Sequence, residues 1–182
     1  MSLRKYFRKM RGSTHGSPPR VSHSEILWSW IGSFIGISSV AWVSMGFFQG
    51  TDLTLMIGSY GASAVLAYGA VRSPLAQPRN LVGGHIVSAL IGVACYKLLP
   101  GVPWLAQAGA VSTAIAMMHA TRTLHPPGGA TALIAVIGSE EIHRMGWLYV
   151  LVPATLGPLI LLAVALLVNN IPATRRYPEI WF

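Results

Sequence analysis

Hydrophobic residues along this chain fall into six runs separated by short polar segments. The runs cover residues 26–48, 53–71, 81–99, 104–119, 127–138 and 147–168. The first, third, fourth and sixth are taken as full-length membrane segments, since a crossing spans roughly 30 Å of hydrocarbon. We therefore expect an all-α fold, a polytopic helical membrane protein with about six membrane segments.

The second and fifth runs are the exceptions, and we expect both to be short or broken. Pro126 and Pro127 lack backbone donors, so they end one helix and open the next. A helix over residues 127–138 rises only about 18 Å, which is too short for a full crossing. In the second run, Gly58 and Gly61 lie among hydroxyl side chains, a composition that disfavours a uniform helix.

Composition supports the membrane assignment. Hydrophobic residues make up 53% of the 182 residues and charged residues only 10%, whereas soluble domains carry about 25% charged residues. The net charge of +8 alone would suit nucleic acid. The basic residues, however, lie in the tails or singly between apolar runs, as topogenic charges do, so we expect no nucleic-acid partner and a lipid bilayer instead.

The positions of the basic residues predict the topology. With six crossings and a cytoplasmic N-terminus, Lys97 and Arg144 are the only two of the 13 Lys and Arg residues outside. With four crossings, Arg72, Arg79 and Arg122 also move outside, which the positive-inside rule disfavours. We expect a basic cytoplasmic tail at 1–21, a transmembrane domain at 22–171 and a C-terminal tail at 172–182, with both termini cytoplasmic.

The two broken runs resemble each other. The segment GASAVLA at 61–67 aligns with GATALIA at 129–135, and each lies between two full-length runs. We interpret residues 26–99 and 104–168 as two inverted three-segment repeats, because an odd number of spans reverses the orientation. The alternative stays open that both segments are only small-residue helix interfaces.

Five stretches together identify a family. They are GSYGASAVL (58–66), SPLAQPRN (73–80), GGHIVSAL (83–90), LHPPGGATAL (124–133) and RRYP (175–178). With these motifs, residues 26–178 resemble the HPP family of integral membrane proteins. The resemblance implies a multi-pass protein of the cell inner (plasma) membrane and, from members associated with nitrite transport, a transport function. The family is often described with four spans; we attribute the difference from six to the short second and fifth runs.

The break at the double proline is where we expect substrate to bind. A helix that starts there is expected to leave the amides of Gly128, Gly129, Ala130 and Thr131 unpaired, an arrangement that binds anions. By the repeat, Gly61, Ala62 and Ser63 are expected to present a second helix N-terminus from the opposite side.

Polar and basic residues around the break are expected to form a positive vestibule for the anion. These residues are Gln77, Arg79, Asn80, His85, His119, Arg122 and His125. The alternative is that the arginines only snorkel to lipid headgroups. The favoured function is thus a channel or facilitator for a small inorganic anion, without catalytic residues or a cofactor, and the family resemblance implies nitrite as that anion.

Two other functions remain open. The histidines at 85, 119 and 125 allow a metal-binding membrane protein, although their spacing matches no standard ligand motif and Cys95 is the only cysteine. A non-transporting membrane scaffold or regulator is the second. No acid and nucleophile pair at useful spacing indicates an enzyme, and a homo-oligomer is expected.

Overall fold

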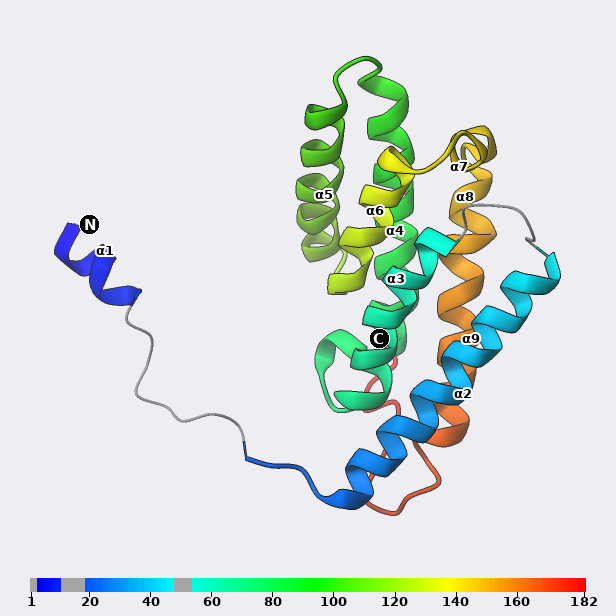
Figure 1. Cartoon of the computed structure of the whole chain (residues 1–182). Coiled ribbons are helices and arrows are strands. Elements are labelled where there is room, and N and C mark those ends of the chain that lie inside the picture. The colour runs from blue at the N-terminus through cyan, green and yellow to red at the C-terminus, as the bar shows by residue number, and fades with distance from the viewer. Residues whose placement is uncertain (1–2, 11–18, 48–53) are drawn as a thin grey trace.

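The computed structural model describes residues 3–10, 19–47 and 54–182, and these ranges are helical with no β-strand (Figure 1). The elements are α1 (Leu3–Lys9), α2 (His23–Phe47), α3 (Thr54–Ala64), the π-helix η1 (Val65–Gly69), the 3₁₀-helix η2 (Pro74–Ala76), α4 (Pro78–Leu98), α5 (Pro103–Ala120), α6 (Pro126–Ile137), α7 (Glu140–Met145), α8 (Leu148–Leu151) and α9 (Pro153–Val168). The predicted all-α fold is confirmed. The end of the first apolar run at residue 48, the start of the second at residue 53, and residues 1–2 and 11–18 of the N-terminal tail lie outside the described residues.

Three described stretches are long and apolar enough to cross a membrane: His23–Gly46, Pro78–Leu98 and Leu148–Val168. The helix α6 is a shorter apolar helix, and it begins at Pro126, one residue before the predicted start. Large hydrophobic side chains such as Trp42 and Leu167 are exposed on the outer faces of these helices, as lipid contact requires. Six crossings in two repeats remain a prediction.

The helix α2 begins at His23, directly after Ser22. The backbone N–H of Glu25 donates to Ser22 Oγ at 3.2 Å, which caps the helix. Gly32 and Gly36 receive the ring of Tyr68 from η1: a Cβ on Gly32 would lie 2.8 Å from Tyr68 Cδ1, and one on Gly36 would overlap the hydroxyl. The GxxxG pair therefore admits a tyrosine ring at this interface.

The second apolar run differs from the expectation. Residues 54–64 form a continuous α-helix that passes through Gly58 and Gly61 without a break, and the irregularity comes later, in the π-helix η1. Consequently GASAVLA at 61–67 covers the end of α3 and the start of η1, while GATALIA at 129–135 lies inside α6. The two aligned segments have different local structures.

The helix α4 lies at the centre and contacts α5, α6, α8 and α9. Small residues on one face of α4 lie against α6 and the segment before it. An added Cβ on Gly84 would lie 2.5 Å from His125 Cβ, and one on Gly92 would lie 2.5 Å from Ala132 O. Three alanines at four-residue spacing on α5 (Ala106, Ala110, Ala114) are buried in the same region.

The sixth run is divided at a proline. The short helix α8 ends at Leu151, and α9 starts at Pro153, while Pro158 lies within α9. The segment that follows α9 returns to the start of α2, where Arg175 and Glu25 form an ion pair.

Candidate functional site

A cluster of five fully buried polar side chains lies between α3, α4 and α6. It comprises Ser59 and Ser63 of α3, His85 of α4, His125 at the N-cap of α6, and Thr131 of α6. The two serines are one helical turn apart, so both point from the same face of α3. Three segments that are distant in sequence thus place hydroxyls and imidazoles in one compact group.

The five side chains form a continuous row of hydrogen bonds. Ser63 Oγ lies 2.9 Å from His125 Nε2 and 2.8 Å from His85 Nε2, so it bridges the two imidazoles. On the other side of its ring, His85 Nδ1 lies 2.7 Å from Thr131 Oγ1. Thr131 Oγ1 in turn lies 2.8 Å from Ser59 Oγ. We call these five residues the Ser–His row.

Both ends of the Ser–His row meet backbone carbonyls. His125 Nδ1 lies 2.8 Å from Leu75 O, and Ser59 Oγ lies 3.1 Å from Pro127 O. Two tyrosines pack beside it: Tyr149 donates to Thr131 O at 2.8 Å, and the Tyr60 ring centroid lies 5.9 Å from that of His85. The buried polar groups of the row are therefore all hydrogen-bonded.

Glycine makes this close approach possible. Gly84 lies against the backbone before α6, where an added Cβ would be 2.8 Å from Thr123 O as well as close to His125. Gly128 lies against Ser88, with 2.6 Å between a built Cβ and Ser88 Oγ. Without side chains at these positions, α6 starts directly against α4, which brings His125 to His85.

The expected bare amides are not found. The first two residues of α6 are prolines without N–H groups, and the amide of Gly128 donates to His125 O at 2.8 Å. The amides of Gly129, Ala130 and Thr131 belong to the helical ladder that starts at His125. The prediction that these amides are unpaired is therefore wrong, because the N-cap carbonyl and the ladder supply their acceptors.

The second predicted helix N-terminus is also wrong. Gly61, Ala62 and Ser63 lie in the last turn of α3, where the backbone N–H groups point into the helix. Ala62 is exposed. Ser63 is nevertheless a member of the Ser–His row, through its side chain rather than its amide.

A cationic cavity lies at the end of the row that contains His125. It has a volume of about 300 Å³ and is lined by Pro74, Gln77, Arg79, Asn80, Arg122 and the segment Ile180–Phe182. The predicted vestibule residues Gln77, Arg79, Asn80 and Arg122 are thus brought together. Among these described lining residues there is no Asp or Glu.

Three of the vestibule residues also form hydrogen bonds with backbone groups. Arg79 donates to Thr121 O at 2.7 Å, and Asn80 donates to Leu124 O at 2.8 Å. Gln77 is buried, and its Oε1 accepts from the amides of Glu179 and Ile180. These bonds hold the linker between α5 and α6 and the C-terminal segment at the cavity.

His119 does not join the other histidines, because its side chain is exposed on α5. Within the part of the chain that the structure describes, no group of three or more His, Cys, Asp or Glu side chains is placed to hold a metal ion. Sequence reasoning missed Ser59 of the Ser–His row. Its position one turn before Ser63, on the same face of α3, is the signal that identifies it.

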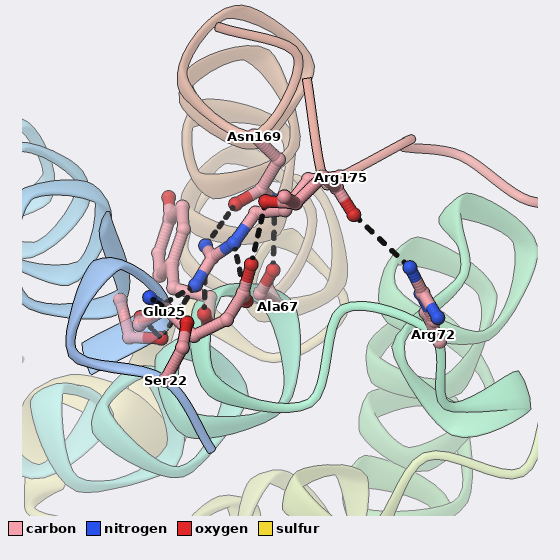
Figure 2. A network of polar contacts seen from close by, with 9 residues as sticks. Ser22, Glu25, Ala67, Arg72, Asn169 and Arg175 are labelled. Atoms are coloured by element: carbon pink, nitrogen blue, oxygen red, sulfur yellow. Dashed lines mark hydrogen bonds and ion pairs between the residues drawn. The ribbon is translucent and has the colours of Figure 1, made fainter. Parts of the chain in front are cut away.

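A second buried network joins the C-terminal segment to α2 and lies at the ends of α2 and α9 (Figure 2). Arg175 Nε donates to Glu25 Oε2 at 2.8 Å, and its terminal nitrogens donate to Glu25 O, Ser29 Oγ, Tyr68 O and Asn169 Oδ1. Asn169 further donates to Ala67 O. A cavity of about 450 Å³ lies beside it. Burial raises the pKa of Tyr177 in the same segment, and its protonated hydroxyl donates to Ala76 O.

Comparisons with known proteins agree with the assignment of the chain as a membrane protein. Residues 18–178 match the family described as HPP, transmembrane region. Two transmembrane proteins of Dictyostelium discoideum are similar: one is 47% identical over 97% of this chain and 57% of its own length, the other 42% identical over 100% and 65%. The chain thus spans about three fifths of these relatives. No solved structure matches. The chain belongs to the HPP transmembrane family.

Proposed function

We propose that this membrane protein carries a small inorganic anion across the bilayer as a facilitator, with nitrite as the first anion to test because of the family resemblance. The observation that supports it most is the cavity beside Arg79 and Arg122, which has no acidic side chain among its described lining residues. A concave site with one sign of charge raises the local concentration of the opposite ion.

The cavity adjoins the Ser–His row at two points. Asn80 lines the cavity and donates to Leu124 O, and the next residue is His125. Pro74 also lines the cavity, and the next residue, Leu75, accepts from His125 Nδ1. An anion that moves inward from the cavity therefore meets His125 first, and the row is its path between α3, α4 and α6.

The charges along α4 support a cytoplasmic cavity. Arg79 lies in the first turn of α4 and Lys97 in the last, about 27 Å apart along the helix axis. Three further arginines lie near the Arg79 end of α4. Arg122 lines the same cavity as Arg79. Arg72 donates to Thr174 O of the C-terminal segment, and Arg175 lies in that segment, where it pairs with Glu25. By the positive-inside rule this end faces the cytoplasm.

The test is protein-dependent uptake of nitrite into vesicles, with Arg122→Asn as the variant. Arg122 has a φ of 57°, which asparagine tolerates well, so the exchange removes the charge at small structural cost. We expect uptake at low nitrite to fall about tenfold, because a focused charge raises the encounter rate by that order.

Arg122→Lys is the matched control, since it retains the charge, and it should keep most of the uptake. Wild-type uptake should also fall with ionic strength, because salt screens the exposed guanidinium. Wild-type protein with no uptake above that of protein-free vesicles contradicts anion transport. Equal uptake by the Asn and Lys variants contradicts the role of the cavity.

A further inference from the structure

The hydrogen bonds of the Ser–His row have directions that its carbonyl ends determine. A carbonyl oxygen only accepts, so His125 Nδ1 carries the proton that is donated to Leu75 O. In a neutral His125, Nε2 is then an acceptor and Ser63 donates to it. Ser63 has one proton, so its oxygen accepts from His85 Nε2–H, and His85 Nδ1 accepts from Thr131.

The hydrogen bonds of the row can also all point in the opposite direction, with every donor paired to an acceptor, once one proton is added. With both nitrogens of His125 protonated, Nε2–H donates to Ser63, and Ser63 donates to His85 Nε2. His85 Nδ1–H then donates to Thr131, Thr131 donates to Ser59, and Ser59 donates to Pro127 O. The second carbonyl thus provides the final acceptor that the reversed row needs.

The added proton has two possible protonation sites, the imidazoles of His85 and His125. Their ring centroids are 5.2 Å apart, and the Ser63 hydroxyl lies between their Nε2 atoms. When His85 Nε2–H passes its proton to Ser63 Oγ, the serine passes its own proton to His125 Nε2. One N–H bond breaks and one forms, and the hydroxyl is unchanged.

Among the residues that the structure describes, no carboxylate is hydrogen-bonded to the histidines of the row. The sequence contains no Asp or Glu between residues 53 and 139, which covers α3 to α6. The titratable or charged side chains around the row are Tyr60 on α3, Tyr149 on α8, Arg79 on α4 and Arg122 in the linker before α6. A buried positive charge without a partner is strongly unfavourable, so an anion must accompany the proton.

The geometry points to electroneutral co-transport, in which the Ser–His row takes up one proton together with each anion. This inference rests on the proposed anion transport, and it replaces an uncoupled facilitator with a carrier that couples each anion to a proton. All five side chains are fully buried, so the site exchanges its contents only when it opens to one face. Proton and anion that are loaded together therefore move in the same direction.

The experiment measures nitrite uptake and lumenal acidification together, in vesicles that contain a trapped pH dye, with protein-free vesicles subtracted. A mildly alkaline medium keeps the lipid-permeant undissociated acid scarce. We expect one proton to enter with each nitrite in the wild type. Nitrite uptake without protein-dependent acidification overturns the coupling and leaves anion transport intact, whereas no nitrite uptake overturns both.

The variant Ser63→Ala removes the only hydroxyl between the two imidazoles and should lower coupled uptake at least tenfold. Ser88→Ala is the control, since Ser88 lies on α4 outside the row and contacts Met118 Sδ, and it should match the wild type. Ser63→Thr restores a hydroxyl and should recover uptake. Wild-type uptake and proton ratio in Ser63→Ala overturn the relay; a thermal unfolding scan of each variant identifies loss through misfolding.

Discussion

The molecule contains two buried polar networks that differ in what their atoms can do. Around Arg175, every guanidinium N–H donates to an oxygen that is a carbonyl, a carboxylate, a hydroxyl or an amide oxygen (Figure 2). In the Ser–His row, the internal members are hydroxyls and imidazoles, which both donate and accept. The Arg175 network has one arrangement, while the row has two that differ by a proton.

The difference separates a structural bond from a candidate transport site. A guanidinium stays charged and has no lone pair, so the Arg175 network is a fixed clamp between the C-terminal segment and α2. The Ser–His row carries no formal charge in its neutral state, and its polarity reverses without moving heavy atoms. Loss of the clamp should therefore affect stability, and changes within the row should affect transport.

The largest stability effect is expected from Arg175→Ala. The Arg175 side chain is 4% exposed, and removal leaves Glu25 Oε2 and the amide oxygen of Asn169 without this donor. Breaking a fully buried ion pair costs about 3–5 kcal/mol, and the cost here is lower because the Glu25 side chain is 30% exposed and becomes hydrated. Thermal unfolding in detergent should show a large decrease in the midpoint. Arg176→Ala is the control, since Arg176 is adjacent and exposed; equal effects in the two variants contradict the clamp.

A smaller loss of stability is expected from Gly84→Ala, which changes the Ser–His row by altering the packing of α4 against α6. The new Cβ would lie 2.5 Å from His125 Cβ, so α6 must move away from α4. Overpacking of this kind costs about 1–3 kcal/mol, and the His85–His125 geometry should be lost with it. We expect nitrite uptake to fall more steeply than the unfolding temperature.

Gly58→Ala is the matched control for that variant. Gly58 lies in α3, where an added Cβ meets nothing within 4 Å. Alanine in place of a helical glycine contributes about 0.5–1 kcal/mol of stability. A Gly84→Ala protein that unfolds and transports like Gly58→Ala would show that the close contact between α4 and α6 is not needed.

The sequence predicted the elements with local signals. The helix that starts at the double proline was predicted, because Pro126 and Pro127 are themselves the signal. The cap at Ser22 and the small-residue face of α4 likewise depend on residues close together in the sequence. The gathering of Arg79, Asn80 and Arg122 was also predicted, because they lie at the ends of adjacent helices.

The remaining features depend on tertiary contacts. The amides at the start of α6 were expected to be free, but Pro126, Pro127 and the His125 carbonyl leave no such donors. Arg175 and Glu25 are 150 residues apart and give no pattern that joins them. The direction of the hydrogen bonds in the Ser–His row became visible only once Leu75 O and Pro127 O were located.

The most direct test of a neutral path for the anion is the voltage dependence of nitrite uptake. Vesicles with wild-type protein are clamped at zero potential and then at about 100 mV, inside negative, where one elementary charge is worth about 2.3 kcal/mol. We predict the same protein-dependent initial rate at both potentials, because proton and anion cross together. A rate several-fold lower at the negative potential means that the anion crosses alone and contradicts the account.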